Sequence, residues 1–105
     1  MLTQAVDAYL AIRRAAGFQL NETERILRDF VAFADAANDT FIRTPTVLAW
    51  AVKGRSPQAR FMRMRTVVLL AYYLRAEDDR HDLPPVEAFG RHPSRRRPPL
   101  PFFVG

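Results

Sequence analysis

Residues 56–79 read SPQARFMRMRTVVLLAYYLRAEDD, and this stretch decides the predicted fold. Ser56 is a favourable N-cap residue, and Pro57 suits the first helical position, where its missing N–H costs nothing. The run from Val67 to Leu74 is apolar all round, as expected for a central helix that is packed on several sides. We therefore predict one helix from Pro57 to about Asp79, which forms the centre of the core.

The beginning of this stretch is strongly basic. Residues 54–66, GRSPQARFMRMRT, contain no acidic residue and four arginines, which are Arg55, Arg60, Arg63 and Arg65. Solvated helix surfaces usually alternate positive and negative side chains, and no neighbour in this stretch neutralises the charge. The arginines must therefore be met by the rest of the chain or by a partner.

Two helices are predicted in the first third of the chain. The first runs from Thr3 to about Ala16, and Gly17 suits the position just past a helix end. The second begins at NETE, where we expect Asn21 as the N-cap and Glu24 as its capping-box partner. Its apolar stripe faces the core, so Arg25 and Arg28 are expected to project toward solvent or a partner.

A third helix is predicted between these two and the central one. It opens with TPTVLAWAV, with Thr44 as the N-cap and Pro45 at the first helical position, and it ends near Lys53. No strand-like alternation is present, so the predicted fold class is all-α with four helices. The side chains expected to be buried together are Ile26, Phe30, Phe33, Leu48, Val67, Leu70 and Leu74.

The composition favours a folded domain with an anionic partner. Hydrophobic residues make up 49% of the 105 residues, enough for one modest core. The net charge of +5 is unevenly placed, because residues 1–52 hold five arginines and six acidic residues, whereas residues 53–105 hold eleven Lys and Arg and five acidic residues. We therefore expect an anionic partner, nucleic acid before a membrane surface.

Several kinds of site are disfavoured. The chain has no cysteine, which excludes disulfides and thiolate metal sites. His81 and His92 have no carboxylate or cysteine at metal-ligand spacing, so no metal, cofactor or acid–base role is expected for them. No window reaches the roughly 18 apolar residues of a membrane helix, and no leader pattern opens the chain, so a cytoplasmic protein is expected.

The last part of the chain is rich in proline and arginine. We expect residues 1–80 to form the helical domain and residues 81–105 to form an extended basic arm, since such a segment cannot compact and its charges must stay solvated or meet phosphate. The arm would place Arg95, Arg96 and Arg97 along a nucleic-acid backbone. A solubilising tail is the alternative.

Five stretches in order resemble the N-terminal core-binding domain of tyrosine recombinases, the phage-integrase-like enzymes of mobile elements. They are AYLAIRRAAGF, ERILRDFVAFAD, LAWAV, SPQARFMRMRTVVLLAYYLRAEDDRHDLPP and RHPSRRRPP. The resemblance implies a four-helix SAM-like bundle that forms half of a C-shaped clamp around duplex DNA. It also implies that the second and fourth helices present their N-terminal ends to the major groove.

The resemblance also implies that DNA binding by this part and catalysis belong to separate domains of the full recombinase. The family's catalytic arginine, lysine, histidine and tyrosine residues lie in a domain downstream of the arm, which is absent from this chain. We therefore expect a non-catalytic DNA-binding module whose partners are double-stranded DNA and other recombinase subunits, with no membrane and no small-molecule substrate.

This chain departs from the family pattern at two places. Relatives often carry basic residues just before the second helix, where this chain has Gln19, Asn21 and Glu22. Relatives also tend to have an arginine in the second half of the fourth helix, where this chain has Val68. A DNA-facing surface at the start of the second helix is therefore expected to be weaker.

The candidate DNA contacts combine arginine, which binds phosphate or guanine through a bidentate fork, with glutamine, which pairs with adenine. Arg65 lies about 140° from Arg60 around the helix, so the arginines cannot all meet one groove. The candidates are Arg25, Arg28, Arg55, Gln58, Arg60, Arg63, Arg65, Arg95, Arg96 and Arg97.

The aromatic residues are assigned to the core. Trp50 is expected to be a core anchor rather than a stacking platform, and Tyr72 and Tyr73 are expected to pack inside the bundle rather than act as nucleophiles. Two other functions stay open: a protein-interaction module that uses FMRM and VVLLAYYL as an apolar surface, and a free-standing regulator or remnant of a recombinase.

Overall fold

A computed structural model describes residues 2–17, 19–85 and 88. These residues form four α-helices and no β-strand: α1 (Leu2–Ala15), α2 (Asn21–Ala36), α3 (Thr44–Ala51) and α4 (Pro57–Arg75). The all-α prediction is confirmed for this part of the chain. None of these helices is both long and apolar enough to cross a membrane. Arg95, Arg96 and Arg97 of the predicted arm lie outside the described residues.

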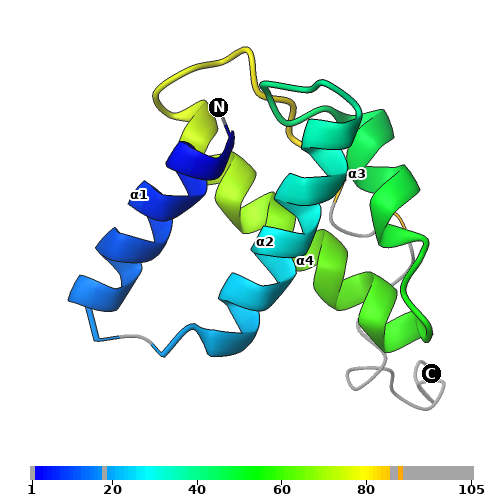
Figure 1. The fold of residues 1–105 in the computed structure, drawn as a ribbon, viewed down its shortest axis with the longest axis horizontal. Helices are drawn as coiled ribbons and strands as arrows, with labels where there is room; N and C mark the ends of the chain where they lie inside the picture. The colour runs from blue at the N-terminus through cyan, green and yellow to red at the C-terminus, as the bar shows by residue number, and fades with distance from the viewer. Residues whose placement is uncertain (1, 18, 86–87, 89–105) are drawn as a thin grey trace, which may run out of the picture.

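The helices run alternately down and up in Figure 1, and α4 crosses the others obliquely. α4 packs on α1, α2 and α3, as predicted for the central helix. Because α2 and α4 run in the same general direction, both begin at the same end of the bundle (Figure 1). The connection from α3 to α4 also lies at this end.

The core forms along one side of α4. Val67 and Leu70 are fully buried, and Phe30 meets Trp50 edge to face with ring centroids 5.1 Å apart. Trp50 is 1% exposed, so its prediction as a core anchor is confirmed. Of the seven residues expected to be buried together, five are buried and two, Phe33 and Leu48, pack partly buried at the edge.

α4 is packed on several sides, as predicted, but one strip of it is exposed. Leu69 is 39% exposed and Tyr72 is 60% exposed, so Tyr72 does not pack inside the bundle. Tyr73 does pack against the core, with its ring 5.3 Å from that of Tyr9. The strip of α4 that carries Leu69 and Tyr72 is the part left exposed along these turns.

Only one of the three predicted N-caps is confirmed. Ser56 accepts a hydrogen bond from the backbone N–H of Ala59 at 3.0 Å. Asn21 was predicted to cap α2, but it is the first helical residue and the preceding Leu20 is the buried cap. The side chain of Glu24 pairs with Arg14 instead of closing a capping box.

The start of α3 is capped from a distant part of the chain. Thr44 lies inside the helix rather than before it, and its backbone N–H donates to the carboxylate of Asp82 at 2.8 Å. The end of α4 also differs from the prediction, since the helix stops at Arg75 rather than near Asp79. Aspartate side chains compete for backbone N–H groups, and Asp78 accepts from the N–H of Arg80 at 3.0 Å.

The segment after α4 is fastened to the connection between α2 and α3. We call these contacts the clasp: the N–H of Ile42 donates to Nδ1 of His81 at 3.1 Å, and the N–H of Asp82 donates to the carbonyl of Ile42 at 2.8 Å, beside the bond from Thr44 to Asp82. His81 is 8% exposed and its ring meets that of Phe41. The first residues after position 80 thus pack on the helices, while the proposed division into a domain and an arm stays a prediction.

Replacing Leu70 by alanine should lower the free energy of unfolding by about 2–5 kcal/mol, because it empties a fully buried position on the central helix. The matched control is Leu69→Ala one residue earlier, which should cost less than about 1 kcal/mol. Urea denaturation of both variants measures the difference. Equal losses for the two would contradict the observed orientation of α4.

His81 should make stability fall on mild acidification. Burial lowers its pKa below the usual value of 6.5, although Asp78 opposes the shift, whereas Arg80 and Arg43 add to it. The unfolded chain therefore binds the extra proton first, so the stability that the neutral ring contributes is complete above about pH 6.5 and is lost as the pH falls through the folded pKa. The Nδ1 acceptor for Ile42 also requires that this nitrogen carry no proton.

The test compares urea denaturation of the parent and His81→Asn between pH 7.5 and 5. The asparagine amide offers an oxygen acceptor near the position of Nδ1 and does not titrate. We expect the difference between the two unfolding free energies to change with pH only below about 6.5. A difference that is constant across this range would show that His81 is equally protonated in the folded and unfolded chains.

Candidate nucleic-acid interface

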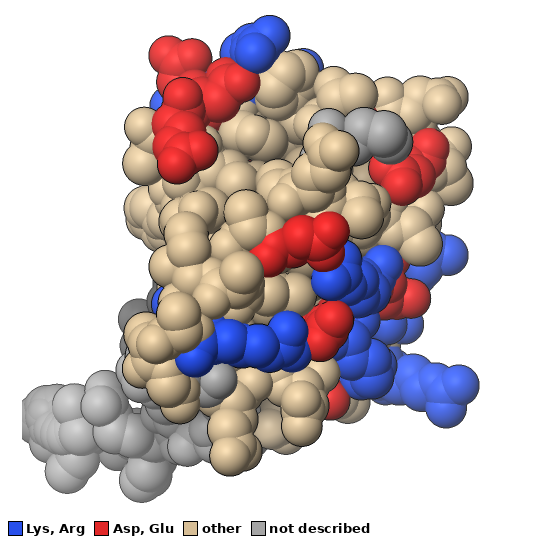
Figure 2. Space-filling view, turned by 60° about the vertical axis from the view of Figure 1, so that its left-hand side comes forward, with Lys and Arg blue, Asp and Glu red and all other residues tan. Residues whose placement is uncertain are grey.

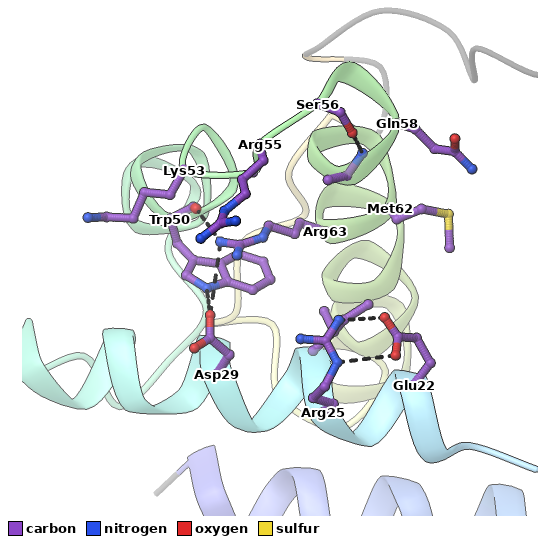
Figure 3. A pocket seen from close by; sticks show the side chains of 13 residues that line it. Glu22, Arg25, Asp29, Trp50, Lys53, Arg55, Ser56, Gln58, Met62 and Arg63 are labelled. Carbon is purple, nitrogen blue, oxygen red and sulfur yellow. Dashed lines mark hydrogen bonds and ion pairs between the residues drawn. The ribbon is translucent and has the colours of Figure 1, made fainter.

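A cleft of about 490 Å³ opens at the end of the bundle where α2 and α4 begin (Figure 3). One wall is the first half of α2, and the other is formed by the α3–α4 connection and the first turns of α4. The described residues that line it include four cations and two carboxylates, so the cleft has a net positive charge. The charged and amide side chains are Glu22, Arg25, Asp29, Lys53, Arg55, Gln58 and Arg63.

Arg63 forms the floor of the cleft together with Trp50 and Asp29. Its guanidinium donates to the backbone carbonyl of Trp50 at 3.0 Å and lies 4.8 Å from the centre of the indole ring. The carboxylate of Asp29 accepts the indole N–H at 2.8 Å and lies 3.9 Å from Arg63 (Figure 3). Three side chains from α2, α3 and α4 are thereby joined.

Arg60 is also occupied within the fold. Its guanidinium donates to the carbonyl of Gly54 at 2.9 Å. The acceptor lies in the α3–α4 connection, so this bond ties the start of α4 to the segment that follows α3. Gly54 allows α4 to approach this closely, since a Cβ atom there would lie 2.9 Å from the backbone nitrogen of Arg60. Two of the four arginines of residues 54–66 are therefore met by the chain itself.

Arg25 and Glu22 form an ion pair on the wall formed by α2. Two parallel contacts join them, from Nε of Arg25 to Oε1 of Glu22 at 3.1 Å and from Nη2 to Oε2 at 2.5 Å. Both side chains are about two-thirds exposed. The hydrogen bonds from Arg25 lower the pKa of Glu22, so the pair is fully ionised at neutral pH. Arg25 is therefore exposed but already holds an anionic group.

Arg55 is the cation that faces the cleft most openly. It is exposed, and Figure 3 shows its side chain pointing into the cleft toward Arg63. Gln58 is also exposed and projects from the first turn of α4. The amine of Lys53 lies 5.6 Å from the centre of the Phe33 ring and points away from Arg55 (Figure 3). Two guanidinium groups therefore converge on one space, where an anion would reduce their mutual repulsion.

Arg28 faces α1 rather than the cleft. It lies 2.6 Å from Asp7 on α1 and 3.4 Å from Glu24, which also pairs with Arg14 at 2.5 Å. Asp7 raises the pKa of Arg28 and Arg14 lowers that of Glu24. Figure 2 shows the side of the molecule nearest α1, where positive and negative side chains are interleaved on the lower part. Arg28 and Arg14 are therefore paired with acidic side chains of the chain itself.

Arg65 lies two helical turns beyond Gln58 on α4 and outside the cleft. It borders a second groove between α4 and the segment that follows it. The groove is mostly apolar, and its other lining residues are Val68, Leu69, Tyr72, Leu83, Pro84 and Pro85.

Four of the ten candidate DNA contacts line the cleft: Arg25, Arg55, Gln58 and Arg63. Arg28, Arg60 and Arg65 do not line it, and Arg95, Arg96 and Arg97 lie outside the described residues. Sequence reasoning missed Lys53, although it directly precedes Gly54 and extends the basic stretch by one residue. The role of Asp29 could not be inferred from the sequence, because its contact with Trp50 spans 21 residues.

The sequence is similar to part of a recombination protein. It is 40% identical over 99 residues to a Sinorhizobium fredii protein named "Putative integrase/recombinase y4rB". The match covers 92% of this chain and 32% of that protein, so the chain spans about a third of the length of its relative. No protein-family model matches the chain. No solved structure matches it either.

Replacing Arg63 by alanine should lower the free energy of unfolding by about 1–3 kcal/mol, because the change removes the bond to the Trp50 carbonyl and the contact with the indole ring. Arg55→Ala removes the same charge from an exposed position and should stay within about 0.5 kcal/mol of the parent. Urea denaturation at neutral pH compares them. A larger loss of unfolding free energy for Arg55→Ala than for Arg63→Ala would contradict the structural role of Arg63 and the exposed position of Arg55.

Proposed function

We propose that this chain is a DNA-binding module of a tyrosine recombinase, which clamps one side of duplex DNA and is non-catalytic on its own. The observation that carries the proposal is one positively charged cleft that Arg25, Arg55, Gln58 and Arg63 all line. The similarity of nearly the whole chain to a third of an integrase-named protein supports the same function.

The position of the cleft suits a phosphate backbone. α2 and α4 both begin at this end of the bundle, and helix N-termini carry partial positive charge and free N–H groups. Arg55 adds a full charge whose fork matches phosphate or guanine. Gln58 in the first turn of α4 is suited to the adenine edge in the major groove. The cleft would thus combine backbone contacts with one residue capable of base readout.

The arginines of residues 54–66 divide into two groups in this proposal. Arg60 and Arg63 hold the start of α4 against α3, and they act on DNA by positioning the neighbouring residues. Arg55 and Gln58 contact the duplex directly. Arg65 lies about 10 Å further along the same side of α4 as Gln58, where it would meet a phosphate outside the cleft. The arm residues Arg95, Arg96 and Arg97 would follow the backbone beyond the bundle.

The proposed module does no strand cleavage alone. Phosphoryl transfer needs a nucleophile and a cluster of positive groups around the scissile phosphate. Tyr72 is exposed, but its groove contains Arg65 among mainly apolar side chains. We infer that the catalytic residues are supplied by another part of a full recombinase, and that other recombinase subunits join the assembly on DNA.

The exposed side of α4 supports a second candidate function. Leu69 and Tyr72 line the apolar groove with Leu83 and Pro84, and such a surface suits an apolar segment of another protein. The two functions respond differently to salt, because phosphate binding releases counterions and apolar association does not. If the chain bound its partner equally tightly or more tightly as the salt concentration rises, a protein partner would be favoured over DNA.

DNA binding should be weak and should depend on Arg55. One module of this size is expected to bind non-specific duplex with a Kd of about 10⁻⁴–10⁻⁶ M at physiological salt. Arg55→Gln should weaken binding roughly five- to tenfold and reduce the log–log salt slope by about one, because it removes one phosphate contact. Fluorescence anisotropy of a labelled duplex at several salt concentrations measures both quantities.

Arg75→Gln is the matched control for this titration. Arg75 is equally an exposed arginine but lies at the opposite end of α4, so its loss should change affinity less than twofold. Equal effects of the two substitutions would mean that net charge alone attracts DNA and that the cleft is not the binding surface. Circular dichroism of each variant verifies that the helices are intact.

A further inference from the structure

Glu22 occupies the position on Arg25 that an anionic ligand would take. Arginine binds carboxylate and phosphate with the same planar fork, through two parallel N–H···O contacts. In this structure both contacts of Arg25 go to the two oxygens of Glu22, at 3.1 and 2.5 Å. A phosphate that reaches Arg25 must therefore displace Glu22 or share the guanidinium with it.

The Glu22–Arg25 pair is placed where it can affect ligand binding in the cleft more than the stability of the fold. Both side chains are about two-thirds exposed, and both line the cleft opposite Arg55 and Gln58. Ion pairs at such exposure contribute little to stability because water screens them and the side chains must be ordered. The same weak pairing allows an arriving polyanion to compete for Arg25.

The other two arginines that line the cleft, Arg55 and Arg63, differ from Arg25 in the contacts that hold their side chains. Arg63 is three-quarters buried and is fixed by the Trp50 carbonyl and ring, so it cannot turn toward a ligand without breaking the floor. Arg55 points into the cleft without an acidic neighbour in the stretch around it. The availability of Arg25 to a ligand therefore depends mainly on Glu22, one helical turn away, while Asp29 adds a weaker electrostatic attraction.

We infer that Glu22 is an intramolecular competitor that holds Arg25 away from nucleic-acid phosphate and so limits the affinity of the cleft. The inference rests on the proposed function, because it concerns the same cleft and the same class of ligand. Glu22 would thus help to set the affinity of the cleft for DNA. This role goes beyond its negative charge and its position in the first turn of α2.

A double-mutant cycle of Glu22→Gln, Arg25→Gln and the double variant tests this role. The probe is a fluorescein-labelled 20-base-pair duplex, titrated at low salt by anisotropy. Glu22→Gln should tighten binding roughly three- to tenfold, because it frees Arg25 to contact phosphate. Arg25→Gln should weaken binding less than Arg55→Gln does, because Glu22 already holds its guanidinium. In the Arg25→Gln background, Glu22→Gln should then add less than twofold.

Glu77→Gln is the control for a general effect of charge, since Glu77 is exposed beyond the far end of α4. Competition for Arg25 predicts that this control leaves affinity nearly unchanged. If Glu22→Gln tightens binding equally with and without Arg25, Glu22 acts only through its field and the inference is overturned. An unchanged affinity for Glu22→Gln overturns it as well.

Arg55→Gln, measured in the same titration, separates this inference from the proposed function. Weaker binding of Arg55→Gln together with an unchanged Glu22→Gln would retain the DNA-binding cleft and remove the role of Glu22. Unchanged binding of Arg55→Gln would remove the cleft as the DNA surface, and with it the inference. Both pair residues are exposed, so neither substitution should alter the helical spectrum that circular dichroism reports.

Discussion

The contact of Arg63 with Trp50 and Asp29 is the interaction on which the rest of the structure depends. The guanidinium satisfies a carbonyl near the end of α3 and covers the indole ring, while Asp29 binds the indole N–H from α2. This junction joins the first turns of α4 to α2 and α3, and it forms the floor between the two walls of the cleft.

The local features of the fold are predictable because their causes are local. Ser56 and Pro57 begin α4 as their residue types require, and hydrophobic spacing locates all four helices. The caps at Asn21 and Thr44 were predicted wrongly because tertiary contacts replace them. Leu20 is drawn into the core, and the acceptor for the N–H of Thr44 comes from a residue 38 positions later.

The candidate site could be predicted only in part. Basic residues around the start of α4 indicated its location, but four arginines in one stretch do not reveal which of them the fold uses. Arg60 and Arg63 lie seven residues before the buried Val67 and Leu70, so they share the side of α4 that faces the core. That spacing can be read from the sequence. The hydrogen bonds to the carbonyls of Trp50 and Gly54 cannot, since they form only once α3 and α4 have packed together.

The clasp has a mechanical consequence for the chain. Tension applied from the C-terminal side of Pro85 reaches the backbone bonds of Ile42 and Thr44 before it reaches α4, because His81 and Asp82 are fastened there. These three hydrogen bonds must break before the load reaches the last turn of α4. The clasp lies at the end of the bundle opposite the cleft (Figure 1), so a pull on the chain enters the bundle far from the cleft.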